Sequence, residues 1–135
     1  MKRLTIKKLI VISQSESRSL EIPFKNGLNI ILGGNKTGKS SIIKSIFTTF
    51  GCECKRIEKD WEKIISAYLL FFKYGEKQFC VVRQDKKIQI FENNDDSYSC
   101  IIETEAFHEY SNCLMDILEV KMQCISKEGK QFNVT

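Results

Sequence analysis

The first third of the chain alternates between short apolar runs and polar turns. Residues 2–12 show the alternation of apolar and polar side chains that is typical of a β-strand. Residues 20–24 follow as a second short run, and Pro23 favours an edge position there because proline cannot donate a ladder hydrogen bond. The uninterrupted apolar run Leu28–Leu32 is typical of a central strand that is buried on both faces. The pattern therefore predicts three strands before residue 33.

A helix is predicted soon after these strands. Ile43, Ile46, Phe47 and Phe50 recur at the three- and four-residue spacing of one helix face. Gly51 follows them, and glycine commonly ends helices because it adopts the left-handed backbone conformation at low cost. We therefore expect a helix that buries these apolar side chains and ends at Gly51.

The second half of the chain predicts an antiparallel meander, one helix and a hairpin. Four β-type runs between about residues 64 and 103 are separated by the polar turns GEK, DKK and NNDDS. Thr104 opens a helical pattern that extends to about residue 120. The apolar face of this predicted helix carries Phe107, Tyr110, Leu114, Ile117 and Leu118. The remaining residues have the pattern of another hairpin.

The composition indicates one globular domain. The 135 residues are 42% hydrophobic and 28% charged, which is ordinary for a soluble protein. No apolar run reaches the roughly 18–20 residues that span a bilayer, and the charged start lacks a signal-peptide core. We therefore expect a single cytoplasmic domain over residues 1–135, with no membrane partner. A net charge of +4 permits a polyanionic partner without requiring one.

The six cysteines are interpreted as reduced thiols. No two of them have CxxC spacing, and His108 is the only histidine, so a zinc site and a disulfide framework are both disfavoured. Cys52 and Cys54 form the closest pair, and metal binding by this pair is the alternative.

Residues 33–40, GGNKTGKS, satisfy the pattern of a phosphate-binding P-loop. Gly33 and Gly38 allow backbone conformations in which successive N–H groups point at phosphate oxygens. Lys39 supplies a cation to the phosphates and is the expected catalytic residue, while the Ser40 hydroxyl is expected to hold Mg²⁺. The following helix presents the positive end of its dipole to the anion. The predicted nucleotide-binding residues are Gly33, Gly34, Asn35, Lys36, Thr37, Gly38, Lys39, Ser40 and Ser41.

The chain carries only part of what nucleotide hydrolysis requires. Hydrolysis also needs a carboxylate at the end of a second strand to hold Mg²⁺, and a group that positions water. The usual strand is four apolar residues followed by Asp, and the sequence offers none outside a helical pattern, since Asp116 lies within the predicted second helix. We therefore expect half of an active site.

The segment PFKNGLNIILGGNKTGKSSIIKSIF resembles the beginning of SMC-like ATPase heads. These heads belong to the ABC ATPase class and include the chromosome-maintenance SMC proteins and the repair proteins SbcC, RecF and RecN. The matching residues are Gly27, Asn29, Gly33, Asn35, Gly38, Lys39 and Ser40. Lys36 departs from the family, which has Gly there, and adds a second positive charge to the loop. The resemblance is specific over residues 1–51 and rests on element order over 52–135.

The resemblance implies an α/β fold, namely a P-loop NTPase that forms an ABC-type head lobe with a β-meander and few helices. It implies ATP and Mg²⁺ as cofactors, with hydrolysis only when a C-terminal lobe joins and a second head completes a dimer. DNA and further complex subunits are the other implied partners, and Lys55, Arg56 and Lys59 lie where such heads contact DNA. Similar heads act in DNA repair, chromosome maintenance and bacterial anti-phage systems such as Lamassu.

Two other classes of protein remain open at this point. A small P-loop kinase or a GTPase-like switch shares the loop, although such folds continue with alternating strands and helices. A non-catalytic interaction module would bind an anion at the loop for structural reasons alone. For Lys55, Arg56 and Lys59, a solvated charged surface is the alternative to a DNA contact.

Overall fold

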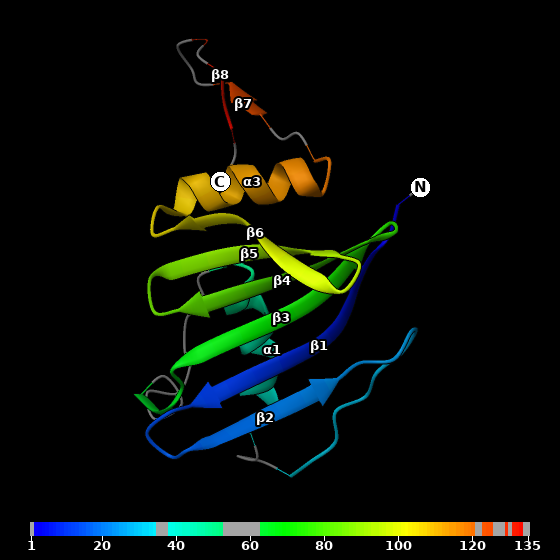
Figure 1. Cartoon of the computed structure of the whole chain (residues 1–135), viewed down its shortest axis with the longest axis vertical. Helices are drawn as coiled ribbons and strands as arrows, with labels where there is room; N and C mark the ends of the chain where they lie inside the picture. The colour runs from blue at the N-terminus through cyan, green and yellow to red at the C-terminus, as the bar shows by residue number, and fades with distance from the viewer. Residues whose placement is uncertain are drawn as a thin grey trace.

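The computed structural model describes residues 2–34, 38–52, 63–120, 123–125, 129 and 131–133. Within these residues the chain forms a large antiparallel sheet, two helices that pack on it and a short hairpin (Figure 1). The elements are β1 (Leu4–Ser13), β2 (Arg18–Pro23), α1 (Lys39–Thr49), β3 (Ala67–Tyr74), β4 (Lys77–Gln84), β5 (Lys87–Asn94), β6 (Ser97–Thr104), α3 (Phe107–Ile117), β7 (Gln123–Ile125) and β8 (Gln131–Asn133).

The large sheet has the strand order β2-β1-β3-β4-β5-β6, and every neighbouring pair is antiparallel. The meander predicted between about residues 64 and 103 is therefore present as β3 to β6. Strand β2 lies at one edge, as Pro23 predicts, and β6 lies at the other. Strands β7 and β8 pair separately as the predicted hairpin. The fold is a mixed α/β arrangement built on an antiparallel sheet with few helices.

The strand predicted for Leu28–Leu32 is absent, and that prediction is wrong. These residues have no regular secondary structure, and the side chains of Leu28, Ile30 and Leu32 are 86%, 69% and 88% exposed. The Asn29 side chain instead bonds the Lys25 backbone, accepting from its N–H at 2.9 Å and donating to its carbonyl at 2.8 Å. An apolar run becomes a strand only when neighbouring strands supply ladder hydrogen bonds. No neighbouring strand lies beside Leu28–Leu32 within the described residues.

Helix α1 lies on one face of the sheet, behind it in Figure 1. The side that packs on the sheet is a stripe of small hydroxyl residues, Ser41, Ser45 and Thr49, which are 6%, 1% and 0% exposed. The Ser45 and Thr49 hydroxyls donate to the carbonyls four residues earlier, so the helix satisfies them internally. Small side chains at every fourth position let the helix backbone approach the sheet closely.

This packing corrects the apolar face predicted for α1. Ile46 and Phe50 pack against the core as expected, but Ile43 and Phe47 point away from the sheet and are 47% and 52% exposed. The helix therefore has apolar side chains on two sides. Only one of these sides is covered within the described residues.

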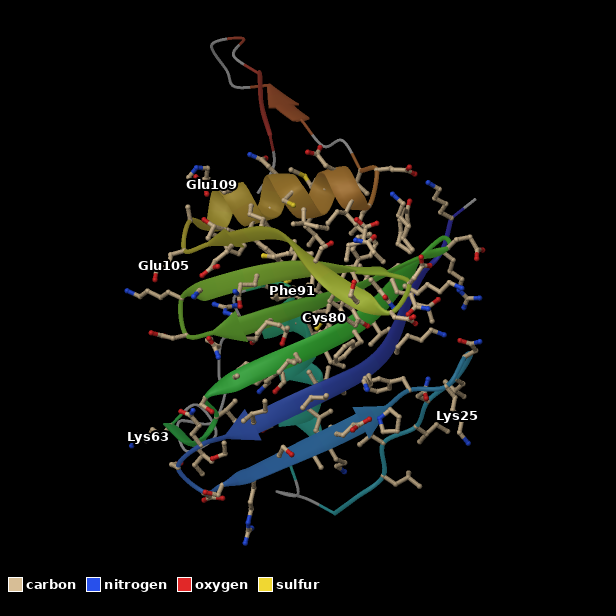
Figure 2. The ribbon with its side chains drawn as sticks, viewed as in Figure 1. Lys25, Lys63, Cys80, Phe91, Glu105 and Glu109 are labelled. Atoms are coloured by element: carbon tan, nitrogen blue, oxygen red, sulfur yellow. The ribbon has the colours of Figure 1, made fainter. Side chains whose placement is uncertain are left out.

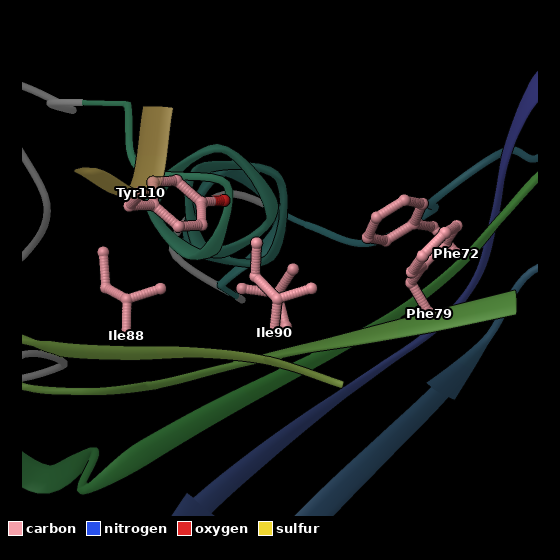
Figure 3. Packing of buried hydrophobic residues seen from close by; sticks show 6 residues of the cluster. Phe72, Phe79, Ile88, Ile90 and Tyr110 are labelled. Carbon is pink, nitrogen blue, oxygen red and sulfur yellow. The ribbon is translucent and has the colours of Figure 1, made fainter. Parts of the chain in front are cut away.

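Two clusters of buried side chains form the core on the α1 face of the sheet. One contains Leu9, Val11 and Leu70, and the other contains Phe72, Phe79, Val81, Ile88, Ile90 and Tyr110. Figure 3 shows the ring of Tyr110 above Ile88 and Ile90, with Phe72 and Phe79 at the other end of the second cluster. Phe50 packs against both clusters, and its ring centroid lies 5.3 Å from that of Phe72. The end of α1 thus joins the two halves of the core.

Helix α1 ends as the sequence predicts. Gly51 has a φ of +94°, its N–H bonds the Thr48 carbonyl, and the N–H of Cys52 bonds the Phe47 carbonyl at 2.9 Å. This pair of bonds is the Schellman motif that closes a helix. Arg83 on β4 also donates to the Thr48 carbonyl, which places a cation at the negative end of the helix dipole. These contacts fix the end of α1 to the sheet.

Helix α3 starts later than predicted. Its N-cap is Ala106, and Thr104 is the last residue of β6, so the assignment of Thr104 as the first cap residue is wrong. The Thr104 hydroxyl still contributes, because it accepts from the Ala106 N–H at 2.9 Å and donates to Glu109 at 2.7 Å. Glu109 lies in the first turn of α3, where a carboxylate is favoured by the dipole (Figure 2).

Candidate functional site: the phosphate loop and its flanks

The candidate phosphate site lies where the chain enters α1. Gly38 is the N-cap with φ +88° and ψ 8°, a left-handed conformation that glycine adopts without strain. Helix α1 then begins at Lys39, as the motif predicts. Its first turn contains no acidic residue and no side-chain cap. The N-terminus of the helix therefore keeps the positive potential and the free N–H groups that suit an anion.

Lys39 closes the loop in this structure. Its ammonium group donates to the carbonyl of Gly33, six residues earlier, and so joins the two ends of the loop. The side chain of Lys39 is half-buried, whereas Ser40 is exposed at the first turn. A ligand phosphate that binds Lys39 has to replace the Gly33 carbonyl as its partner.

The predicted site residues differ in their placement. Gly33 and Gly34 are exposed, and the Ser41 side chain is on the buried side of α1. Ser41 can therefore contact a phosphate only through its backbone N–H, which lies in the first turn of α1. The predicted residues Asn35, Lys36, Thr37, Lys55, Arg56 and Lys59 lie outside the described part of the chain.

Exposed apolar side chains flank the loop on both sides. Leu28, Ile30 and Leu32 precede it, and Ile43 and Phe47 follow it on the outward side of α1. Sequence patterns identify all five as apolar but assign them to the core. One sequence signal could have indicated this exposed surface: α1 carries apolar residues on two sides, a pattern that is typical of a helix covered on both sides.

Burial raises the pKa values of two groups on opposite faces of the sheet, Tyr110 on the α1 face and Cys80 on the other. Burial raises the pKa of the Tyr110 hydroxyl well above its usual range, and it raises the pKa of the Cys80 thiol to about 12. The Tyr110 hydroxyl has no hydrogen-bond partner among the described residues. Both groups are therefore neutral at physiological pH, and neither is placed to exchange protons at the loop.

A hollow of about 580 Å³ lies at the end of α1 that is farther from the phosphate loop. Its lining residues are Gly51, Cys52, Arg83, Lys86, Ile88, Glu105 and Phe107. Glu105 is labelled near the start of α3 in Figure 2. None of these residues belongs to the phosphate motif, so this hollow is separate from the candidate site.

The described residues contain neither a helix that could span a membrane nor a cluster of metal-binding side chains. No helix described here has the length and apolar character needed to cross a membrane. The described residues also contain no group of three or more His, Cys, Asp and Glu side chains suited to hold a metal ion.

Comparison with known proteins covers almost the whole chain. The sequence profile of the AAA domain matches residues 3–133. A Lamassu protein LmuB from Bacillus cereus (strain VD014) is 39% identical over 54 residues, which are 39% of this chain and 10% of the relative. A second Lamassu protein LmuB, from Bacillus sp. (strain NCIM 5461 / CCTCC AB 2011126 / NIO-1130), is 29% identical over 108 residues, or 79% of this chain. The chain matches only 18% of that second relative, so it spans a small part of either protein.

Proposed function

The chain belongs to the AAA domain family of SMC- and SbcC-like ATPases, and on that premise we propose that it is the ATP-binding N-terminal lobe of an ABC-type head. In this proposal the lobe hydrolyses ATP only when a C-terminal lobe joins it and a second head completes a dimer. One domain over residues 1–135 would then carry the phosphate loop. The C-terminal lobe would supply the Mg²⁺-binding carboxylate and the group that positions water, for which this sequence offers no candidate.

The exposed run Leu28–Leu32 directly before the loop is the observation that carries the proposal. Its three large apolar side chains are between 69% and 88% exposed, and Phe47 on the outward side of α1 is 52% exposed. Exposed apolar patches of this kind mark interaction surfaces in soluble proteins. A partner lobe that pairs with residues 28–32 and covers α1 would bury them. The same partner would hold both ends of the phosphate loop.

The described residues fit a nucleotide phosphate. The first turn of α1 has no acidic residue and no side-chain cap, so its N–H groups suit an anion. Lys39 would exchange the Gly33 carbonyl for a phosphate oxygen, and the exposed Ser40 hydroxyl would hold Mg²⁺. When bound, Mg²⁺ neutralises charge on the phosphates. The nucleotide-binding set is completed by Gly34, Gly38, the Ser41 N–H and residues 35–37.

The relatives suggest a role for the assembled protein. Both are named Lamassu proteins, and we propose that this chain also acts in anti-phage defence within a multi-subunit complex in the cytoplasm. DNA is the proposed polyanionic partner, with Lys55, Arg56 and Lys59 as contacts. DNA repair and chromosome maintenance are the alternative roles that we consider for an SMC-like ATPase of this kind.

Nucleotide titrations test the ATP site. Fluorescent ATP and GTP analogues are titrated with and without Mg²⁺ against the unmodified chain, Lys39→Ala and the charge control Lys86→Ala. We expect Lys39→Ala to weaken ATP binding about 10- to 100-fold, because a hydrogen bond to a charged group contributes about 1.5–3 kcal/mol. Lys86→Ala should bind normally, since Lys86 lies in the turn between β4 and β5, away from the loop.

Three outcomes contradict the proposal in different ways. Equal binding by Lys39→Ala would instead support a non-catalytic module. A clear preference for GTP would support a GTPase-like switch. Rapid ATP turnover by this chain alone would show that its active site is complete without a second lobe.

A further inference from the structure

A β-bulge on β1 brings two lysines to the same face of the sheet. The pairing of β1 with β3 shifts register between Ile6 and Lys8, which leaves Lys7 without a partner residue. Ile6 and Leu9 are three positions apart, yet both pack in the same buried cluster. In a regular strand such residues would point to opposite faces. The bulge therefore places both Lys7 and Lys8 on the face away from α1, and both line one hollow.

Aromatic rings form the other wall of this hollow of about 230 Å³. The Lys8 ammonium lies 4.7 Å from the centroid of the Phe71 ring, a cation–π distance. The Tyr98 ring meets Phe71 edge-on, with centroids 6.2 Å apart and planes at 78°. Tyr98 is 47% exposed, so one side of its ring is open to a ligand.

Residues of β3 and β4 form the floor beside these rings. Gln78 also lines the hollow, and its side-chain carbonyl accepts from the Asn93 amide at 3.4 Å. Cys80 on β4 and Phe91 on β5 pair at the centre of the sheet (Figure 2). The hollow therefore offers an aromatic surface with amide groups nearby, which suits a flat ring that carries hydrogen-bonding edges.

A second hollow, of about 500 Å³, continues from the first through Lys7. Its charged lining residues are Lys2, Arg3, Lys7, Lys73 and Glu76. Four cations face one carboxylate, so the hollow favours an anion. Lys73 lines the larger hollow and Gln78 the smaller one, and these two residues are partners in the pairing of β3 with β4. The two hollows are therefore also adjacent across these strands.

The ion pairs of this region are open to solvent. Lys2 pairs with Glu119 at 2.7 Å, Lys8 with Glu21 at 3.5 Å and Lys73 with Glu76 at 3.9 Å. Exposed pairs of this kind are weak and screened by salt, so a phosphate can replace the carboxylate. Within the described residues, Arg3 and Lys7 form no ion pair; Lys7 donates only to Asn26, at 3.3 Å.

We propose that these two joined hollows bind a single-stranded nucleic acid, with phosphates on the lysines and one unpaired base against Tyr98. We name this region the basic–aromatic surface and define it as Arg3, Lys7, Lys8, Phe71, Lys73 and Tyr98. The inference deepens the DNA-associated role proposed above and rests on it, but it does not depend on ATP. Stacking on a protein ring requires an exposed base face, which a closed duplex does not offer.

Two carboxylates near Tyr98 indicate which side of the surface the sugar–phosphate chain follows. Asp95 and Asp96 form the turn just before Tyr98 and repel phosphates there. The sugar–phosphate chain is therefore expected to follow the lysine side, and only a base reaches Tyr98. An acidic peptide would engage the cations equally well but would gain nothing from the ring.

Binding of a fluorescent oligo-dT tests the proposal by anisotropy at several salt concentrations, with a hairpin duplex of equal charge as the comparison. We expect Tyr98→Ala to weaken binding of the single strand about 5- to 150-fold and to leave duplex binding unchanged. Tyr98→Phe keeps the ring and should bind normally. Lys7→Ala should lower the slope of log K against log salt by about 0.7, whereas the remote Lys86→Ala should not.

Two further variants sharpen the assignment. Asp95→Asn should tighten binding of the single strand, because it removes a carboxylate beside the ring. Lys39→Ala should weaken ATP binding about 10- to 100-fold and leave oligonucleotide binding intact, so that the failure of one proposal is separable from the failure of the other. Circular dichroism of each variant establishes that it is folded.

The proposal is overturned if folded Tyr98→Ala and Lys7→Ala bind oligo-dT as the unmodified chain does. It is also overturned if the duplex binds more tightly than the single strand and Tyr98→Ala changes neither, because duplex binding would then use another surface. Displacement of oligo-dT by a poly-Glu peptide at equal charge and equal affinity would likewise assign the surface to acidic proteins.

Discussion

The ring of Tyr110 on α3 lies directly against the backbone of Gly51 at the end of α1. A Cβ at Gly51 would come within 2.7 Å of Tyr110 Cε1 and within 2.8 Å of Phe107 Cε2. Gly51 thus has two roles, because its left-handed backbone ends α1 and its missing side chain admits the ring. This contact connects the helix that carries the phosphate loop to the helix that follows the meander.

Gly51→Ala tests this contact. We expect the free energy of unfolding to fall by about 2–5 kcal/mol, because a left-handed alanine costs about 1–2 kcal/mol and overpacking costs about 1–3 kcal/mol. The matched control is Gly27→Ala, whose φ of +91° is similar but whose Cβ would meet nothing within 4 Å. Urea denaturation of both variants gives the comparison. Equal losses would show that packing against Tyr110 contributes nothing.

Tyr110→Phe tests the cost of the buried hydroxyl. The hydroxyl is unpartnered among the described residues, so its removal at pH 7 should leave stability unchanged or raise it by about 1 kcal/mol. Burial raises the pKa of Tyr110 in the folded state, so its stabilising contribution is complete below about pH 10 and is lost as pH rises further. Tyr110→Phe should therefore lose less stability between pH 10 and 11 than the unmodified chain. A loss above 1 kcal/mol at pH 7 would mean that the hydroxyl is hydrogen-bonded.

Ser45 tests the close packing of α1 on the sheet. The side chain is 1% exposed and its hydroxyl donates to the Ser41 carbonyl of the same helix, so Ser45→Ala should cost about 0.5–1.5 kcal/mol, the net contribution of one hydrogen bond. Ser45→Leu should cost at least about 1–3 kcal/mol, because the stripe leaves no space for the added methyl groups. Thermal denaturation of Ser45→Ala and Ser45→Leu distinguishes the effect of side-chain volume from the effect of the lost hydrogen bond. Tolerance of leucine would contradict the close approach of helix and sheet.

Leu32 and Phe47 test the uncovered apolar surface. Leu32→Ser and Phe47→Ser should change the unfolding free energy of this chain by less than about 0.5–1 kcal/mol, because both side chains are largely exposed. The same changes should reduce binding of a hydrophobic dye and concentration-dependent self-association, measured by light scattering. Leu70→Ser, at a fully buried position, is the control that should unfold the chain. A large loss of stability in Leu32→Ser would place that side chain in the core.

Local sequence patterns predicted most elements correctly, for reasons that concern each segment alone. Pro23 predicted an edge strand because proline lacks the N–H that an inner strand needs. Gly51 predicted the end of α1, since few other residues adopt its backbone conformation without strain. The turns GEK, DKK and NNDDS predicted the meander, because each joins strands that then pair locally.

The errors arise where the outcome depends on neighbouring segments. Leu28–Leu32 has the composition of a buried strand, but it lacks a neighbouring strand within the described residues. Ile43 and Phe47 have helical spacing, but hydroxyl residues occupy the side of α1 that meets the sheet. Lys7 and Lys8 are adjacent, so a regular strand would turn them to opposite faces, yet a bulge turns both to one face. In each case the outcome depends on what packs beside the segment.

The sequence by itself determined the phosphate motif, the meander and the residue that ends α1, because those depend on backbone preferences within a few positions. Only the tertiary structure decided which side of α1 is buried, where Tyr110 meets Gly51 and which lysines gather beside Tyr98. These are relations between segments far apart in the chain. They follow from the space and the hydrogen-bond partners that the folded sheet provides, and no local pattern contains that information.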